Sequence, residues 1–174
     1  MNLSTPQFYF ILIQMGGSNT KLDQVHQVTQ KKKIVIIGGS FGGRVLTQAL
    51  QALDPQEHCF EITIVDKNPH FEFICSNFKS FVDDDFSKNA IAFESMVKYY
   101  NSERVKFVQG KLTNVNHASN EVELEHNGKS FKLPYDIISI VTGGQQTGPW
   151  RADYDAAVTI EGRQNEWNEW RAKV

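Results

Sequence analysis

A run of glycines between two apolar segments is the feature of the sequence most suited to chemistry. Residues Lys31–Leu50 read KKKIVIIGGSFGGRVLTQAL. In the pattern G-x-G-x-x-G, the first glycine permits a tight turn, the second lets backbone approach a pyrophosphate, and the third lets helix and strand pack closely. These positions are Gly38, Ser40 and Gly43. Because Ser40 adds only a Cβ and a hydroxyl, we expect the turn to tolerate it and to bind the phosphates of a nucleotide.

An acidic residue follows at the distance that a ribose site requires. Glu61–Val65 is a second apolar run, and Asp66 stands directly after it. The acid that binds a ribose hydroxyl is expected about 20 residues beyond the glycine turn. An acid rather than an arginine favours an unphosphorylated ribose, as in FAD or NAD.

The elements that must position these residues follow from the hydrophobic pattern. Ile34–Ile37 suits a strand that is covered on both faces. A helix should follow the turn and end at Asp54-Pro55, since a proline disfavours helical backbone before it. One apolar stripe of this helix is expected to pack against the sheet: Val45, Leu46, Ala49, Leu50 and Leu53.

Short segments alternate along the rest of the chain. We expect short helices near Ser76–Val82 and within Ala90–Tyr99, a strand at Val105–Val108, a β-meander at Lys111–Asn116, Glu121–Glu125 and Ser130–Leu133, a buried strand at Ile137–Val141 and a last helix at Arg163–Lys173 that carries Trp167. Ser119-Asn120 and Asn127-Gly128 are turn signals between the meander strands. The fold class expected is α/β, a Rossmann-like parallel sheet with flanking helices and a small antiparallel β-meander, in incomplete form.

Composition and charge argue against nucleic-acid binding and against a metal site. The chain has 174 residues, 40% of them hydrophobic and 22% charged, and a net charge of −2. Binding of nucleic acid is not expected, because it requires a basic face. Cys59 and Cys75 form no metal-binding spacing, and the histidines, His70 among them, are expected to be solvated, so no metal site is predicted.

The first thirty residues differ from the rest. Residues 1–30 are predicted to be a disordered extension, since this polar stretch buries too little apolar surface to offset its ordering entropy. Met15–Thr20 fits the myristoylation pattern M-G-x-x-x-[ST]. Either the match is chance, or translation starts at Met15 and Gly16 carries a myristoyl chain that tethers the protein weakly to a membrane. The expected location is cytoplasmic, with membrane association in the second case.

The order of the motifs resembles a known family. The segments IVIIGGSFGG, IVD, VQGKLTNV, the meander and PYDIISIVTGG together resemble the FAD half of the FAD/NAD(P)-binding pyridine-nucleotide oxidoreductases. Within these, the sequence looks most like the apoptosis-inducing-factor-like branch, which includes NAD(P)H:quinone oxidoreductases of the ferroptosis-suppressor type. The resemblance covers about Lys32–Arg171 and makes residues 31–174 a partial FAD-binding domain that ends in a connector helix.

The resemblance implies roles for individual residues. Asp66 would bind the adenosine ribose with Lys67 beside it, Lys79 stands where the family often has an arginine near the flavin and phosphates, and the backbone of Leu112 would contact the adenine. The FAD pyrophosphate would be held by Gly38, Gly39, Ser40, Phe41, Gly42 and Gly43. Thr142 and Gly143 match the end of the family's A-T-G turn, although Thr142 is also explained as a strand-end residue that satisfies backbone.

The resemblance implies a FAD-dependent NAD(P)H oxidoreductase with a quinone-type acceptor. No CxxxxC pair follows the first helix, so the redox chemistry would fall to the flavin, which takes a hydride from the nicotinamide. The family's second glycine motif, which binds NAD(P)H, and its returning FAD segment have no counterpart in the sequence, and no catalytic residue is assigned. Three hypotheses remain open: a fragment of such an enzyme, a catalytically inactive remnant that acts as a binding or structural subunit, or one half of an enzyme that a second chain completes.

Overall fold

Four parallel strands form the central sheet, in the order β5-β2-β1-β9. They are β1 (Lys32–Ile37), β2 (Phe60–Asp66), β5 (Val105–Gln109) and β9 (Ile137–Ile140). Ile36 of β1 lies between Ile64 of β2 and Ser139 of β9. This computed structural model describes residues 30–82, 86–100, 102–144 and 159–173. The predicted extension and Gly16 therefore lie outside the described residues, apart from residue 30.

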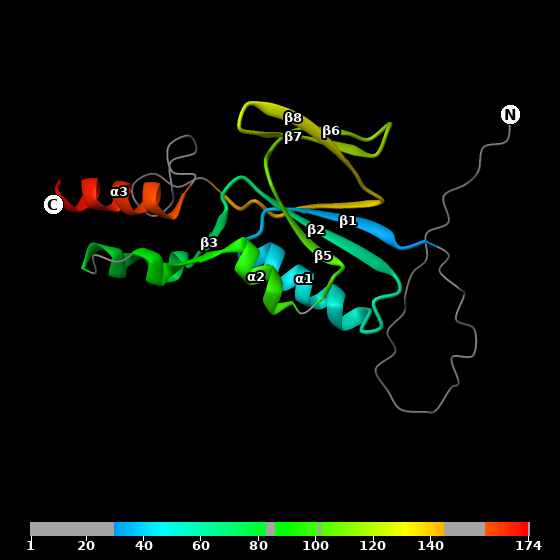
Figure 1. The fold of residues 1–174 in the computed structure, drawn as a ribbon, viewed down its shortest axis with the longest axis horizontal. Helices are drawn as coiled ribbons and strands as arrows, with labels where there is room; N and C mark the ends of the chain where they lie inside the picture. Colours follow the sequence, from blue (N-terminus) through cyan, green and yellow to red (C-terminus); the bar gives the residue numbers. More distant parts are fainter. Residues whose placement is uncertain (1–29, 83–85, 101, 145–158, 174) are drawn as a thin grey trace, which may run out of the picture.

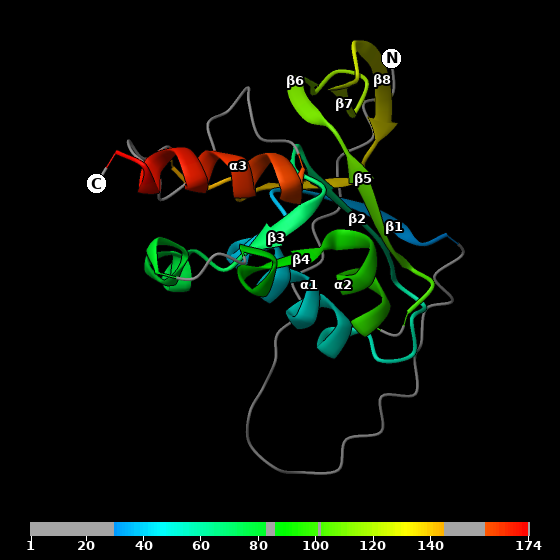
Figure 2. The same ribbon diagram turned by 60° about the vertical axis from the view of Figure 1, so that its left-hand side comes forward.

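The two central strands are apolar on both faces, as expected for a parallel sheet that is covered on both sides. One face carries Ile34, Ile36, Ile62 and Ile64 and packs with helix residues such as Leu46 and Leu50. The other face carries Val35, Ile37 and Val65 and packs with Val122 and Leu124. Figures 1 and 2 show the corresponding layers, with helices α1 (Phe41–Leu53) and α2 (Phe93–Tyr99) on one side of the sheet and the meander on the other. The predicted fold class is confirmed.

Helix α1 (Phe41–Leu53) follows the glycine turn as predicted, but a different stripe faces the sheet. Gly43 and Thr47 are buried, and the Thr47 hydroxyl donates to the Gly43 carbonyl at 2.8 Å. The close approach of Gly43 to the strand sets the rotation of the helix. Leu46 and Leu50 therefore pack inward, whereas the prediction was wrong for the exposed Val45, Ala49 and Leu53.

The meander matches its prediction closely. Strands β6 (Lys111–Asn116), β7 (Glu121–His126) and β8 (Lys129–Pro134) form an antiparallel sheet in sequence order. Its turns use left-handed backbone at Asn120, Asn127 and Gly128, with φ of 53°, 50° and 71°. Asparagine and glycine tolerate this conformation, which is why these residue pairs are turn signals.

A third group of elements lies beside the parallel sheet and contacts it at β5. It contains β3 (His70–Glu72), η1 (Ile74–Phe81), η2 (Phe86–Asn89), β4 (Ala90–Ala92), α2 (Phe93–Tyr99) and α3 (Ile160–Arg171). Helix α3 packs on η1 and η2. Its Trp167 is fully buried with Phe86 and Ala90. Arg163, also fully buried, bonds through Nη2 to Glu72 Oε1 at 2.9 Å.

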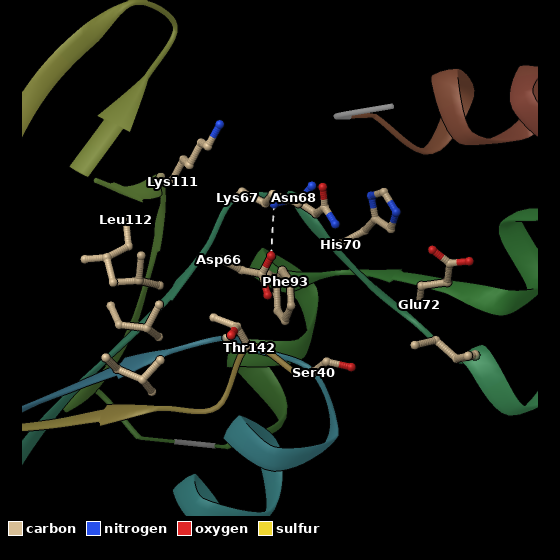
Figure 3. Close-up of a pocket in the computed structure, with 16 residues that line it drawn as sticks. Ser40, Asp66, Lys67, Asn68, His70, Glu72, Phe93, Lys111, Leu112 and Thr142 are labelled. Atoms are coloured by element: carbon tan, nitrogen blue, oxygen red, sulfur yellow. Dashed lines mark hydrogen bonds between the residues drawn. The ribbon is translucent and has the colours of Figure 1, made fainter. Parts of the chain in front are cut away.

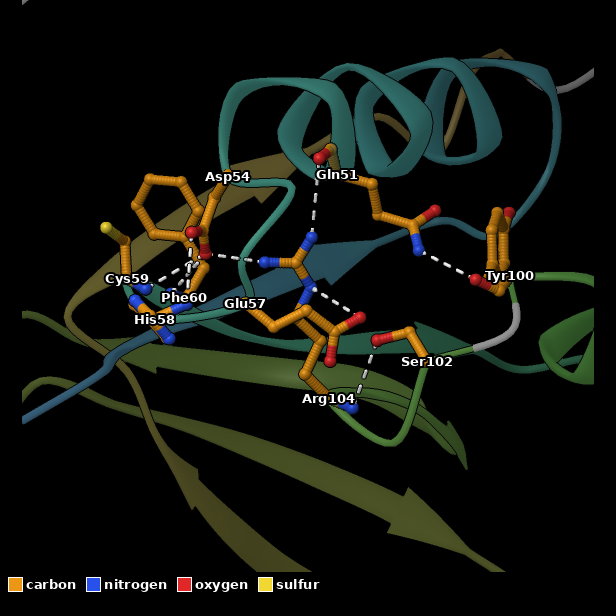
Figure 4. Close-up of polar contacts among 9 residues, drawn as sticks. All are labelled: Gln51, Asp54, Glu57, His58, Cys59, Phe60, Tyr100, Ser102 and Arg104. Carbon is orange, nitrogen blue, oxygen red and sulfur yellow. Dashed lines mark hydrogen bonds and ion pairs between the residues drawn. The ribbon is translucent and has the colours of Figure 1, made fainter.

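A buried ion pair ties the end of α1 to the beginnings of β2 and β5 (Figure 4). Arg104 Nη1 donates to Asp54 Oδ2 at 2.5 Å, with both side chains at least 96% buried. The same carboxylate accepts the backbone N–H groups of His58, Cys59 and Phe60. Burial favours a higher pKa of Asp54, but these N–H groups and Arg104 outweigh burial and lower the pKa.

Strand β9 departs from its predicted burial. Ile137 is 48% exposed and Ile140 is 57% exposed, although the apolar run predicted a buried strand. Among the described residues β9 pairs only with β1. An edge position explains why these isoleucines retain contact with solvent.

Candidate functional site

The carboxyl ends of all four parallel strands meet at one edge of the sheet. Gly38 follows β1, Asp66 ends β2, Gly110 follows β5, and Thr142 comes shortly after β9. These four residues line a cavity of about 360 Å³ (Figure 3). Ligands of open α/β sheets bind outside the carboxyl ends of the strands. Of the residues that the sequence singled out, six line this cavity: Gly38, Ser40, Asp66, Lys67, Leu112 and Thr142.

The glycine turn has the geometry that its residue types predict. Gly38 has φ of 104°, and a Cβ there would lie 2.8 Å from the Val141 carbonyl group. A Cβ on Gly43 would lie 2.0 Å from the Gly38 carbonyl oxygen. Both distances exclude a side chain without movement of backbone. Ser40 is the N-cap of α1, and its hydroxyl makes no capping hydrogen bond.

The other turn residues support the cavity without lining it. The Gly39 N–H donates to Asp66 Oδ2 at 2.8 Å. A Cβ on Gly42 would contact Val141. The Phe41 ring packs against Phe71 and Phe73, with centroid distances of 5.3 Å and 5.5 Å. The structure therefore gives Phe41 a packing contact, and a contact with phosphate remains a prediction for these residues.

The Asp66 carboxylate is held by backbone at the cavity wall. Oδ2 accepts from Gly39 N–H, and Oδ1 accepts from Asn68 N–H at 3.0 Å. Burial raises the pKa of Asp66, while the backbone N–H groups of Asn68, Gly39 and Lys67 and the Lys67 charge offset part of that effect. A carboxylate has about four lone-pair sites, so three N–H donors leave capacity for a ligand hydroxyl. The predicted ribose-binding residue thus lies beside the glycine turn.

Two residues singled out by the sequence lie away from the cavity lining. Lys79 is exposed on η1 and is not among the lining residues. Gly143 has φ of 71° and continues the turn after β9, next to Thr142, which does line the cavity.

Sequence reasoning missed one side of the cavity. His70, Glu72 and Phe93 line it, and His70 is only 3% exposed, so the expectation of a solvated histidine was wrong. Its surroundings include Phe86 and Arg163. Arg163 lies 93 positions later in the chain, and no local pattern indicates such a neighbour. The signal available for Gly110 was its place after a parallel strand, since carboxyl ends share an edge.

The residues present fit a nucleotide with a diphosphate. The N-terminus of α1 opens at the glycine turn and offers N–H groups and the positive end of the helix dipole to an anion. Asp66 lies beside it as an acceptor for hydroxyls, and Leu112 adds an apolar wall on the far side of Asp66 (Figure 3). This arrangement can bind phosphate, sugar and base in sequence along the cavity.

Comparisons with known proteins find one curated relative of similar sequence. No protein-family model matches the chain. The chain is 28% identical over 124 residues to apoptosis-inducing factor homolog A of Dictyostelium discoideum, covering 71% of this chain and 26% of that protein. It therefore spans about a quarter of the length of the curated relative that it matches.

Two solved structures share the fold. Sulfide:quinone oxidoreductase of Aquifex aeolicus matches with a TM-score of 0.58 and 21% identity, over 81% of this chain and 32% of that one. NDH2 of Plasmodium falciparum, solved in complex with NADH, matches with a TM-score of 0.60 and 18% identity, over 83% of this chain and 29% of that one. The chain thus has, over part of its length, the fold of the FAD/NAD(P)-binding pyridine-nucleotide oxidoreductases.

Proposed function

We propose that the cavity binds FAD and that the chain is the FAD-binding part of an NAD(P)H oxidoreductase of the apoptosis-inducing-factor-like type, with a quinone-type acceptor. The observation that carries this proposal is the meeting of the glycine turn with Asp66 at the carboxyl edge of the sheet, 2.8 Å apart from Gly39 N to Asp66 Oδ2. The 28% identity to an apoptosis-inducing factor homolog supports the branch. The shared fold with a sulfide:quinone oxidoreductase supports a quinone acceptor.

Within this proposal the residues of the chain bind and orient. Backbone N–H groups at the start of α1 and the Ser40 hydroxyl hold the diphosphate, and Asp66 accepts from the hydroxyls of the adenosine ribose. FAD, when bound, supplies the redox chemistry, accepting a hydride from a nicotinamide and passing electrons to an acceptor. The site for NAD(P)H would come from a further part of the protein or from a second chain.

Titration of the purified chain with FAD tests the proposal. Bound flavin should show quenched fluorescence and a heat of binding, and ADP should bind as well because it carries the ribose and the diphosphate. Gly43→Leu should abolish binding of both, since the added side chain overlaps the Gly38 carbonyl. Gly144→Ala is the matched control, because a Cβ there meets no atom of the described residues within 4 Å. Absence of ADP and FAD binding to the folded wild type would contradict the proposal.

A second candidate is a remnant of this fold that binds or assembles without catalysis. It is favoured by one observation: within the described part of the chain, the strand–glycine turn–helix unit occurs once, at β1 and α1. NADH added to the FAD-loaded chain separates the candidates. Bleaching of the flavin absorbance, with this chain alone or after addition of a completing polypeptide, supports the oxidoreductase. Tight FAD binding with no bleaching in either case supports the remnant.

Membrane association remains a separate proposal. In the described ranges, no helix combines the length and apolar character that crossing a bilayer requires. The proposed tether is a myristoyl chain on Gly16. Intact-mass measurement of the native protein tests it, since a mass that includes Met1 contradicts processing at Gly16.

A further inference from the structure

The two sides of the cavity differ in chemistry. On one side of Asp66 lies Leu112, and on the other lie His70 and Glu72 (Figure 3). The glycine turn and Asp66 offer backbone N–H groups and a carboxylate to a diphosphate and a sugar. His70 and Glu72 belong to β3, which is not part of the parallel sheet. A ligand longer than a nucleoside diphosphate would extend toward them.

His70 has no hydrogen-bond partner for either ring nitrogen within the described part of the chain. Its side chain is 3% exposed and borders the cavity. Burial, together with the positive charge of Arg163, lowers the pKa of His70 to about 4, so the imidazole is neutral near pH 7. A neutral imidazole has one N–H donor and one acceptor nitrogen. A buried polar group without a partner costs about 1–3 kcal/mol, so the ring nitrogens of His70 require a partner that the described residues do not supply.

The neighbouring charges already have partners. Arg163 Nε and Nη2 bond to the Glu72 carboxylate, and Arg163 Nη1 pairs with Glu166 at 2.7 Å. Asn77 Nδ2 also donates to Glu72 Oε1, at 2.6 Å. The guanidinium is therefore committed to carboxylates and is not a phosphate site. Among His70, Glu72 and Arg163, His70 is the group without a hydrogen-bond partner in the described part of the chain, and it can pair with an uncharged ligand group.

We propose that His70 is a ligand-binding residue that pairs, as the neutral imidazole, with an uncharged hydrogen-bonding group of the FAD molecule beyond its diphosphate. The group is a sugar-alcohol hydroxyl or a ring carbonyl or N–H of the flavin portion. This inference rests on the proposed FAD function and makes it more specific, since it separates recognition of the adenosine diphosphate from recognition of the flavin portion. His70 is thus a specificity residue for FAD over ADP.

Binding of two probes to one set of variants tests the proposal. ADP and FAD are titrated calorimetrically into the full chain, its His70→Phe variant and its His70→Gln variant. Phe keeps a ring of similar size without hydrogen-bonding groups, whereas Gln keeps one donor and one acceptor. We expect His70→Phe to weaken FAD binding roughly fivefold to tenfold, the loss of about one hydrogen bond. ADP binding should stay within twofold of wild type, and His70→Gln should recover part of the FAD affinity.

The titrations with ADP distinguish failure of the proposed FAD function from failure of the role proposed for His70. If wild type binds neither ADP nor FAD, the proposed function fails and this inference fails with it. If wild type binds both and His70→Phe binds FAD equally well, only this inference is overturned. Equal weakening of ADP and FAD in His70→Phe also overturns it, since the loss then reflects the fold of the cavity.

A measurement on the unmutated protein gives an independent readout. Nitrogen-15 chemical shifts of the His70 imidazole report hydrogen bonding of the ring directly. We expect these signals to move on saturation with FAD and to remain in place on saturation with ADP. Signals that respond equally to the two probes, or to neither, would overturn the proposal.

Discussion

At the scale of single residues, the glycine turn requires residues that have no Cβ atom. Gly43 packs so closely on the strand end that a Cβ would lie 2.0 Å from the Gly38 carbonyl oxygen. Gly38 adds a left-handed backbone conformation, with φ of 104°, which L side chains rarely adopt. The turn therefore combines a steric and a conformational requirement within six residues.

Gly43→Ala should destabilise the protein by about 2–3 kcal/mol, since the overlap is with backbone and only a shift of the helix relieves it. Urea unfolding measures the change in the free energy of unfolding. The control is Gly144→Ala, where the added Cβ meets none of the described part of the chain within 4 Å and the expected change is within about 0.5 kcal/mol. Equal stability of Gly43→Ala and wild type would show that the helix does not approach the strand this closely.

Asp66 should make nucleotide affinity depend on pH. Burial raises the pKa of its carboxyl, and only the ionised carboxylate accepts hydroxyls through both oxygens. ADP affinity should therefore fall as the pH drops through this raised pKa and reach its plateau above it. Asp66→Asn should bind ADP about tenfold or more weakly, since hydrogen bonds to charged groups contribute about 1.5–3 kcal/mol. Calorimetric titrations across pH should show the pH dependence in wild type and lose it in Asp66→Asn.

His70 should lower stability in mild acid. Its pKa falls from 6.5 in the unfolded chain to about 4 in the folded one, so between these values the unfolded state binds the extra proton. Stability is therefore unaffected by His70 above about pH 6.5, decreases as the pH falls toward 4, and levels off below it. The loss reaches at most about 3 kcal/mol, from 1.36 kcal/mol per pKa unit.

The difference between wild type and His70→Phe isolates this effect from the other titrating groups. Denaturant unfolding at several pH values should show wild type losing stability relative to the variant between pH 6.5 and 4. Parallel stability curves for the two proteins over this range would contradict the buried, neutral state of His70.

At the scale of elements, one carboxylate organises three segment ends. The Asp54 carboxylate pairs with Arg104 and accepts hydrogen bonds from three backbone N–H groups at and just before the start of β2. Helix α1 ends just before Asp54, as the Asp54-Pro55 pair predicted. The ion pair with Arg104 holds the start of β5 beside β2. The bond between Arg104 Nη1 and Asp54 Oδ2 spans 50 positions of sequence.

Replacing Asp54 should cost more than replacing Arg104. Asp54→Leu leaves a buried guanidinium without its strongest partner and removes the acceptor of three N–H groups, so we expect a loss of about 3–5 kcal/mol. Arg104→Met leaves the carboxylate its three N–H donors and should cost less. Urea unfolding measures both, with Lys32→Met as the control, because the Lys32–Asp136 pair is exposed and is expected to contribute under about 1 kcal/mol. A loss in Arg104→Met as large as that in Asp54→Leu would contradict this ranking.

Local patterns predicted most of the elements but not the short strands β3 and β4 or the 3-10 helix η2, and tertiary contacts decided the rest. Strand periods, the glycine turn and the Asn127-Gly128 turn are properties of a few neighbouring residues, and the structure has all of them. The facing stripe of α1 was missed because two overlapping stripes fit the sequence, and only the approach of Gly43 selects the one with Leu46 and Leu50. His70 was missed because its burial depends on residues far along the chain, such as Arg163.

At the scale of the whole molecule, three structural groups meet around the cavity: the parallel sheet with α1, the meander, and the third group of elements, which contains α3. Helix α3 packs through Trp167, which is buried with Phe86 and Ala90, and through Arg163. The Arg163 guanidinium bonds to Glu72 and Glu166 and lies 4.9 Å from the Trp167 ring centroid. Because Glu72 lines the cavity, docking of α3 and the shape of the site are connected.

Arg163→Met should loosen α3 without unfolding the sheet. Removing one partner of a buried ion pair leaves Glu72 uncompensated, which is strongly destabilising where the pair forms. Hydrogen exchange followed by mass spectrometry should show faster exchange in residues 160–171, with β1 and β2 unchanged. Glu169→Gln is the control, since Glu169 is exposed on the same helix. Unchanged exchange in α3 of Arg163→Met would contradict its role as the anchor.

The two-sided apolar character of β1 has a consequence for alignment during folding. A slip of β1 by one position would exchange isoleucine and valine between the layers, so the hydrophobic effect alone distinguishes poorly between neighbouring pairings. The discrimination must come from polar contacts at the strand ends: the Asp136 carboxylate on Lys33 N–H and the Asp66 carboxylate on Gly39 N–H. The bond from Gly39 to Asp66 therefore favours the observed pairing of β1 with β2, whether or not a nucleotide is bound.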